Sequence, residues 1–174
     1  MRNVHMNQLV RFRKEKDNFF IRDDQSPLTR GQKQKFQELA YFSENPSLSL
    51  KVTLVEFPGK EVVNIQTSTG YMQTYQKIGS FNFPVERQDT SLSLYANDQG
   101  FFLPFVDSLA GGETYGAGRY VEAHSMGDGE FVLDFNFAYN PYCAYNDKWS
   151  CPLTPAENRL GVPIATGEMV FEGY

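Results

Sequence analysis

With 174 residues, the chain is long enough to bury a hydrophobic core without disulfides or a structural metal, and one domain is expected. Hydrophobic residues make up 41% of it and charged residues 21%, with 15 Phe and 10 Tyr, which excludes a mainly disordered chain and is typical of β-rich globular proteins. The formal net charge is −5, and no apolar run is long enough for a membrane span or a signal-peptide core. We therefore expect a cytoplasmic protein that has no membrane partner.

The charge is unevenly distributed along the chain. Residues 1–40 hold 9 basic and 5 acidic side chains (net +4), whereas residues 41–174 hold 7 and 16 (net −9). Because basic and acidic residues are interleaved in RFRKEKD, the pattern favours a solvated helical arm that docks on an acidic body. An acidic body without a strip of basic and aromatic residues argues against a nucleic-acid partner. We expect a single domain, 1–174, whose helical arm, 1–40, packs on a β body, 48–174.

Two helices are expected in the arm. The first covers residues 6–20, where apolar side chains recur within a charged segment. The second begins near Ser26-Pro27 or at Thr29, because Thr29 and Gln32 have the spacing of a capping box. It places Phe36 and Leu39 on one face and ends at Asn45-Pro46.

The period of the apolar residues then changes to two, which predicts β-strands. Leu50, Val52 and Leu54 alternate with polar residues, and 57–60 reads as a turn before a return strand around Ile65. Further strands are expected at 71–83, 84–96, 100–106, 118–125, 130–138 and 160–172. No helical period separates them, which argues against parallel βαβ units. The fold class is mainly β: an antiparallel meander that forms a barrel-like or two-layer sheet, with one or two short N-terminal α-helices.

The register of one hairpin can be predicted. If Gly127-Asp128-Gly129 is a three-residue loop between strands 118–125 and 130–138, Val121 lies opposite Phe135 on an apolar face. A loop of two or four residues would shift the pairing by one and bury polar side chains among phenylalanines. We therefore favour the three-residue loop.

The polar face of this hairpin carries a candidate for acid–base chemistry. The register places Glu122 opposite Asp134, and like charges in that position are destabilising unless something offsets them. A bound cation, a nearby Arg, a shared proton or simple exposure to water would each do so. His124 and Asn136 flank the pair. A solvated outer face of a sheet is the structural alternative.

Two irregular segments do not fit the strand pattern. Residues 107–117 are glycine-rich, and residues 138–159 carry three prolines and several aromatic residues without a period. Loops of that length usually pack on themselves or build a site. Arg119 follows the first loop and could bind an anion through its planar guanidinium, or pair with a carboxylate such as Asp107, Asp134 or Glu157.

The chain has two cysteines, Cys143 and Cys151, both in the second loop. Without an export signal, two thiols are expected to be reduced. A nucleophilic Cys143 needs a base or a positive charge nearby, and no histidine is close to it in the sequence. The spacing of the cysteines does not match a zinc site, and neither a metal nor another cofactor is expected.

Long motifs in these loops resemble one known family. The runs FLPFVDSLAGGETYGAGRY and LDFNFAYNPYCAYNDKWSCPLTPAENRLGVPIATGE, with KDNFF, SPLT and LAYF before them, are similar to domain of unknown function 1684. The resemblance covers nearly the whole chain, and it departs from the family at Thr154, where a proline is usual. It implies a domain with no established reaction. It also implies that the family's pattern residues, Glu168 among them, gather in the two loops and the hairpin.

These observations predict a site at the junction of loops 107–117 and 138–159. The expected catalytic residues are Asp134, Glu157 and Cys143, and the expected ligand-binding residues are Asp107, Tyr115, Arg119, Asn136, Tyr139, Asn140, Tyr145 and Asn158. The favoured hypothesis is a small-molecule-binding β domain, with a hydrolase or lyase as its enzymatic form. The alternative is a non-catalytic protein-interaction or scaffold module that uses loop 138–159, with Tyr142 and Trp149 as exposed anchors. The sequence leaves open whether the protein is an enzyme, what its ligand is and whether it forms oligomers.

Overall fold

The computed structural model describes the backbone of residues 2–173 and the side chains of residues 8–173. Two helices, α1 (Arg2–Arg22) and α2 (Arg30–Lys35), precede eight strands. The strands are β1 (Ser49–Gln66), β2 (Met72–Val85), β3 (Gln88–Asn97), β4 (Gly100–Phe102), β5 (Pro104–Phe105), β6 (Arg119–Tyr120), β7 (Ala123–Gly127) and β8 (Glu130–Asp134). Four short 3-10 helices complete the secondary structure: η1 (Pro46–Leu48), η2 (Phe135–Phe137), η3 (Tyr142–Ala144) and η4 (Ala156–Asn158).

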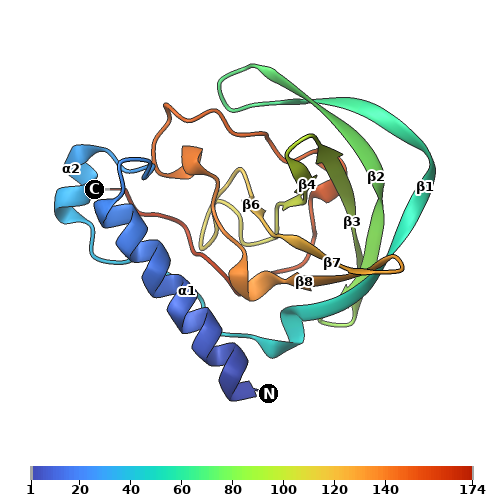
Figure 1. Cartoon of the computed structure of the whole chain (residues 1–174), viewed down its shortest axis with the longest axis horizontal. Coiled ribbons are helices and arrows are strands. Elements are labelled where there is room, and N and C mark those ends of the chain that lie inside the picture. The colour runs from blue at the N-terminus through green and yellow to red at the C-terminus, as the bar shows by residue number, and fades with distance from the viewer. Residues whose placement is uncertain (1, 174) are drawn as a thin grey trace.

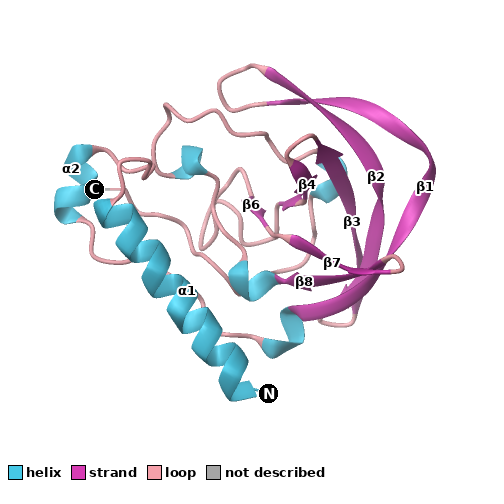
Figure 2. Ribbon diagram, in the orientation of Figure 1, coloured by secondary structure: helices cyan, strands magenta, loops and turns pink. Residues whose placement is uncertain are grey.

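The strands form a nearly closed, barrel-like antiparallel sheet, which confirms the predicted fold class (Figures 1 and 2). Six strands pair in the order β4-β3-β2-β1-β8-β7. The edge strands of this sheet are β4 and β7. The segment that joins them along the chain contains a separate two-stranded pair, β5–β6, and a hydrogen bond from the Val121 N–H to the Leu103 carbonyl (3.1 Å). Helix α1 runs along the open side, away from β1 and β2 (Figure 1).

The helical arm differs from its prediction in length. Helix α1 has 21 residues and is longer than expected, and α2 stops at Lys35. The predicted capping box is present, because Thr29 accepts from the Gln32 N–H and Gln32 accepts from the Thr29 N–H. Because α2 stops at Lys35, Phe36 and Leu39 follow the helix and do not share one of its faces, although both are buried. No described helix is both apolar enough and long enough to cross a bilayer.

The predicted turn at 57–60 is wrong, because β1 continues through it as one strand of 18 residues. The ladder with β2 runs to Glu56 opposite Gly79 and resumes at Glu61 opposite Lys77, so the four residues between form an irregularity. A Cβ at Gly79 would lie 2.4 Å from the Val55 carbonyl oxygen, which explains the glycine at this close approach. β1 pairs with β8 through residues 49–53, and with β2 through residues 54–56 and 61–66.

The β7–β8 hairpin keeps the predicted register over residues 123–125, where Ala123 lies opposite Leu133, but the predicted Val121–Phe135 pair does not form, because Phe135 lies in η2 beyond the end of β8. The predicted loop is also wrong, because the turn contains only Asp128 and Gly129, both with positive φ. An irregularity between Ser125 and Gly127 inserts Met126, and this extra residue restores the register that a two-residue turn would shift.

Two further expectations about this half of the chain are wrong. Glu122 does not pair with Asp134, since β7 begins at Ala123 and Asp134 pairs with Ser49 of β1. Residues 160–172 form no strand. They run as irregular chain with bends at 161–162 and 166–167 and make a single bridge, between Tyr41 and Glu168, because their backbone groups bond to loops and side chains instead of a neighbouring ladder.

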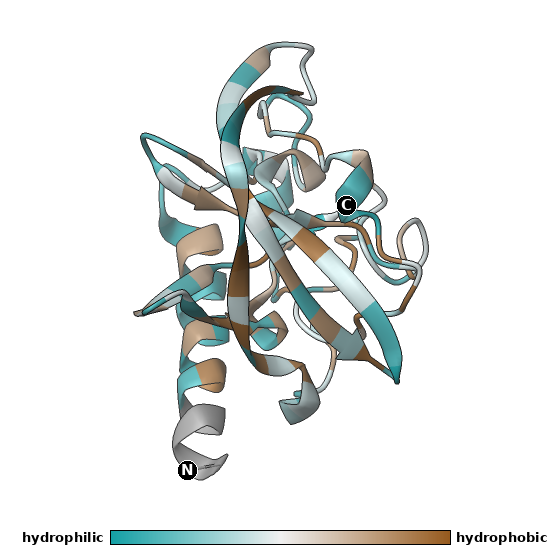
Figure 3. Ribbon diagram, turned by 90° about the vertical axis from the view of Figure 1, so that its right-hand side faces the viewer, coloured by the Kyte–Doolittle hydropathy of each residue, from teal (hydrophilic) through white to brown (hydrophobic). Residues whose placement is uncertain are grey.

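The main core lies on the inner face of the sheet. Hydrophobic and hydrophilic residues alternate along the strands, as the coloured bands of the ribbon show (Figure 3), and Phe81, Leu92 and Leu94 are fully buried. A second cluster joins the arm to loop 138–159, where the Phe20 and Tyr145 rings meet edge to face at 4.9 Å. A third, small cluster of Ile65, Tyr75 and Tyr95 lies at the outer end of the sheet.

Candidate functional site

Arg119 lies at the start of β6 and its side chain is 1% exposed. Its Nη1 donates to the carbonyl oxygens of Thr166 (2.5 Å) and Glu168 (2.9 Å), and its Nη2 donates to that of Ile164 (2.7 Å). Burial lowers the pKa of Arg119 to about 10, while Asp107 and Glu168 counteract the effect, so the group stays charged at neutral pH. The guanidinium therefore binds the backbone of the C-terminal segment.

Of the three carboxylates expected as partners of Arg119, Asp107 is the one that faces it. Its Oδ2 lies 3.7 Å from Nη2 of Arg119 and accepts the Ile164 N–H at 2.9 Å. Its Oδ1 accepts the Thr114 hydroxyl at 2.7 Å. Because both oxygens have protein donors and the side chain is buried, Asp107 joins the glycine-rich loop to the C-terminal segment.

A second buried carboxylate, Glu168, is the centre of the contact between helix α1 and loop 138–159. Lys16 pairs with its Oε1, while the Asn140 N–H (2.8 Å) and the Tyr145 hydroxyl (2.5 Å) donate to Oε2. The exposure of Glu168 is 1%, so the Lys16 cation compensates a charge that would otherwise be costly to bury. Glu168 is not among the expected catalytic or ligand-binding residues, although an acidic residue within the mainly apolar segment 160–171 was a signal.

Two predicted ligand-binding amides are used as backbone clamps. Asn158 is fully buried, accepts the Ser93 N–H and donates to the carbonyls of Ser93 and Pro104. Asn136 bonds both the N–H and the carbonyl of Asn45. An amide has one acceptor and two donors, so it can replace a strand neighbour for an irregular segment.

Glu157 has a different environment at the outer end of the sheet. Lys77 (2.8 Å) and the Tyr95 hydroxyl (2.6 Å) both donate to its Oε1. Partial burial opposes ionisation, but the hydrogen bonds from Lys77 and Tyr95 outweigh it and lower the pKa of Glu157 to about 2. The carboxylate is therefore ionised at neutral pH and suited to accept a hydrogen bond, not to donate a proton.

Glu157 lines a pocket of about 400 Å³, here called the sheet-end pocket. Its walls come from β1, β3 and the end of loop 138–159, and consist of Val63, Asn64, Ile65, Gln66, Tyr95, Leu153, Thr154, Pro155 and Glu157. The apolar part of the lining is Val63, Ile65, Leu153, Pro155 and the Tyr95 ring, and the polar part is Asn64, Gln66, Thr154 and the Glu157 carboxylate. Concave sites of this size with few polar groups are typical of small-molecule sites.

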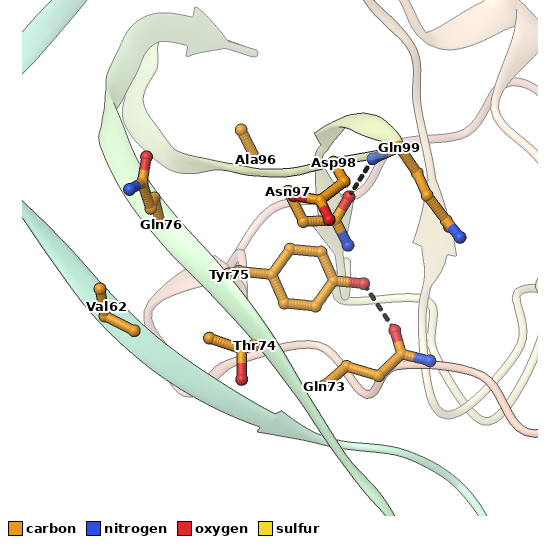
Figure 4. A pocket seen from close by; sticks show the side chains of 9 residues that line it. All are labelled: Val62, Gln73, Thr74, Tyr75, Gln76, Ala96, Asn97, Asp98 and Gln99. Carbon is orange, nitrogen blue, oxygen red and sulfur yellow. Dashed lines mark hydrogen bonds between the residues drawn. The ribbon is translucent and has the colours of Figure 1, made fainter.

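A larger and more polar pocket, about 670 Å³, is lined by Tyr75 and by residues of β1, β2 and the β3–β4 turn. Figure 4 shows Tyr75 in its centre, with its hydroxyl directed to Gln73 Oε1 at 2.8 Å. The β3–β4 turn, residues 97–99, forms one wall, and β1 and β2 form another. Its lining offers mainly amides and hydroxyls, so water satisfies it well.

The two residues of the predicted carboxylate pair line one pocket, although they are not a ladder pair. Glu122, His124 and Asp134 line a pocket of about 380 Å³ together with the rings of Phe12, Phe137 and Tyr139. The Tyr139 hydroxyl donates to Glu122 at 2.6 Å. Asp134 accepts from Ser49 and caps η2, so it has a structural task in the same place.

Loops 107–117 and 138–159, which were expected to meet, come together at Tyr115 and Cys143. The Tyr115 hydroxyl lies 3.9 Å from the Cys143 sulfur, and both side chains are half-buried. Both cysteines are free thiols, as expected. The three residues predicted to be catalytic nevertheless have different neighbours: Asp134 lies beside β1, Glu157 beside Lys77, and Cys143 beside Cys151.

A family of known sequences matches the part of the chain that holds most of the residues described above. The family described as "Protein of unknown function (DUF1684)" matches over residues 34–169. The chain belongs to the DUF1684 family. The solution NMR structure of an uncharacterized protein from Haloarcula marismortui resembles this DUF1684 member at 32% sequence identity, with a TM-score of 0.72. The likeness covers 96% of this chain and 95% of the other. No curated protein has a sequence that matches this one.

The geometry predicts that Arg119 is a structural brace. In Arg119→Lys, an ammonium group cannot reach all three carbonyls, and those left without a donor remain buried. We expect the free energy of unfolding to fall by about 3 kcal/mol in urea denaturation. The same change at the exposed Arg159 should cost less than about 0.5 kcal/mol. Equal stability of the two variants would contradict the brace.

The environment of Glu157 predicts a pH effect with a definite sign. Since the folded-state pKa is lowered, the carboxylate contributes stability above its unfolded pKa of about 4.3, and this contribution is lost as the pH falls toward about 2. Tyr95→Phe removes one hydrogen-bond donor and should raise the pKa of Glu157 toward about 4.3. The pKa can be measured by the pH titration of the Glu157 carboxyl ¹³C NMR signal. Tyr71→Phe, at a residue that is 73% exposed, is the control and should leave the titration unchanged.

Proposed function

We propose that this DUF1684 member binds a small organic molecule in the sheet-end pocket. The observation that carries the proposal is the combination of apolar walls with one ionised carboxylate: Val63, Ile65 and Leu153 form the walls, and Glu157 is the anchor. Affinity then comes from the apolar contact and orientation from the hydrogen bond.

The charges around Glu157 narrow the chemistry of the ligand. Lys77 neutralises much of the carboxylate's charge, so a strongly cationic ligand gains little from it. A neutral molecule with a hydroxyl or amide donor fits better. Glu157 with a pKa of about 2 is a poor general acid, and Asp134 and Cys143 do not line this pocket. Binding without chemistry is therefore the form of the hypothesis that we favour over a hydrolase or a lyase.

An anion site at the predicted loop junction has a weaker claim than the sheet-end pocket. An anion site there requires an accessible Arg119, whereas all but 1% of that side chain is covered and three of its donors are used by carbonyls. The sheet-end pocket retains one part of the prediction, because loop 138–159 supplies one of its walls through residues 153–157.

The proposal is tested by a matched pair of probes, 4-ethylphenol and ethylbenzene, which share an apolar body and differ in one donor. Both should perturb the methyl NMR signals of Val63, Ile65 and Leu153. The phenol should bind about ten-fold more tightly, since a hydrogen bond to a charged acceptor contributes about 1.5 kcal/mol or more. Glu157→Gln should reduce this preference, whereas Asp98→Asn, in the neighbouring pocket, should keep it. Equal affinities in the unaltered protein, or signals that never move, would refute the proposal.

A second candidate, protein interaction, is supported by a different surface from the one expected. Tyr142 and Trp149 are half-buried and pack on each other at 5.0 Å, so they are poor anchors. The β1–β2 hairpin instead exposes Val62 (63%), Tyr71 (73%) and Met72 (63%). Exposed apolar side chains of this kind are typical of contact surfaces.

We infer that, if the hairpin is a contact surface, it mediates self-association of this chain at high concentration. Sedimentation velocity should then show an oligomer that the double variant Tyr71→Ser, Met72→Ser dissociates. A monomer at all concentrations would exclude this form of the hypothesis.

A further inference from the structure

The side chains of Cys143 and Cys151 lie together beneath the tip of the β1–β2 hairpin. The Cys143 N–H donates to the sulfur of Cys151 at 3.2 Å, and the two thiols share a side-chain hydrogen bond. Cys143 belongs to η3 and is half-buried, whereas Cys151 is 8% exposed. A thiol that solvent reaches is thus paired with one that it barely reaches.

Several hydrogen bonds position Cys151 against the hairpin. Its carbonyl accepts the Ser68 N–H (2.8 Å), and its N–H donates to the Ser68 hydroxyl (3.1 Å). Ser150, one residue before Cys151, donates its hydroxyl to that of Thr67, and Leu153, two residues after it, donates its N–H to the Gln66 carbonyl of β1. The buried sulfur therefore has a defined place, and the more accessible Cys143 lies next to it.

The environment makes the two thiols unequal. The hydrogen bond with Cys151 lowers the pKa of Cys143 to about 6, against the opposing effect of burial and with help from the hydroxyls of Tyr115 and Ser68. The same hydrogen bond, together with burial, raises the pKa of Cys151. At neutral pH Cys143 is a thiolate, and Cys151 carries the shared proton.

We infer that Cys143 and Cys151 form a thiol–disulfide exchange site that reacts with low-molecular-weight disulfides, with Cys143 as the attacking and Cys151 as the resolving thiol. This activity is separate from ligand binding at the sheet-end pocket, since neither cysteine lines that pocket. It uses the loop junction, where Tyr115 of the glycine-rich loop contacts Cys143.

The reaction balances with a disulfide, R–S–S–R, as the oxidant. The Cys143 thiolate attacks one sulfur, the R–S–S–R bond breaks, and one thiolate leaves with the electron pair while Cys143 becomes a mixed disulfide. Cys151 then loses its proton to the departing thiolate and attacks the Cys143 sulfur, which expels the second thiolate. The second thiolate takes a proton from water. The two protein thiols are oxidised to one disulfide, and the small disulfide is reduced to two thiols.

The resolving role of Cys151 follows from the first step. Once Cys143 is part of a mixed disulfide, it no longer carries the negative charge that held the Cys151 proton. The largest cause of the raised Cys151 pKa is thereby removed, at the moment when Cys151 must ionise. The buried position of Cys151 keeps it from reacting first.

The reaction can be followed on the full chain, fully reduced and then exposed to glutathione disulfide. We expect the intact mass to fall by about 2 Da and both titratable thiols to disappear. Cys151→Ser should retain one glutathione on Cys143, and Cys143→Ser should react at least about ten-fold more slowly. The inference is overturned if both thiols persist, if the unaltered protein accumulates only the mixed disulfide, or if the two variants react at the same rate.

A pH profile separates an activated thiolate from a thiol that is merely accessible. The rate of Cys143 alkylation by iodoacetamide, located by peptide mass spectrometry, should titrate near pH 6 in the unaltered protein. Cys151→Ala should move the midpoint toward the ordinary value of about 8.5, and Tyr115→Phe should move it less far in the same direction. Tyr71→Phe serves as the control and should leave it in place. A midpoint near 8.5 in the unaltered protein would contradict the activation of Cys143.

Discussion

The guanidinium of Arg119 donates to three carbonyl oxygens of the segment 164–168, and this interaction supports the half of the molecule that has little regular structure. The segment has no strand neighbour along its length, so its backbone groups need other partners. Arg119 supplies them on one side, Asp107 bonds the Ile164 N–H, and Glu168 turns toward Lys16 of helix α1. One buried cation and two buried carboxylates thus connect the arm, the glycine-rich loop and the C-terminal segment.

This use of polar residues determines where a ligand can bind. Arg119, Asn136 and Asn158 are buried and bonded to the backbone, so they cannot also recognise a ligand without loss of stability. The sheet-end pocket with Glu157 and the junction where Tyr115 meets Cys143 keep accessible chemical groups. The first offers an apolar cavity for binding, and the second offers a reactive sulfur beside a protonated one.

The sequence predicts the fold where the fold depends on the alternation of apolar and polar residues along a strand. It does not predict the site where the site depends on side chains and backbone groups that are distant in the chain. The register that pairs Ala123 with Leu133 follows from the apolar pattern, but the Met126 irregularity, which compensates a shorter turn, leaves no mark in that pattern. Asp107 was expected among three partners of Arg119, whereas the carbonyls of 164–168 carry no side-chain signal in the sequence. A buried amide that clamps backbone, such as Asn158, has the same sequence appearance as one that binds a ligand.

The central claim is that the irregular segments are part of one cooperative structure organised around Arg119. Native-state hydrogen exchange of the Ile164 and Glu168 amides tests it most directly, with the Leu133 amide of strand β8 as the reference. If the claim is correct, all three exchange only through global unfolding and report the same free energy of opening. Exchange of Ile164 and Glu168 through a local opening that leaves Leu133 protected would contradict it.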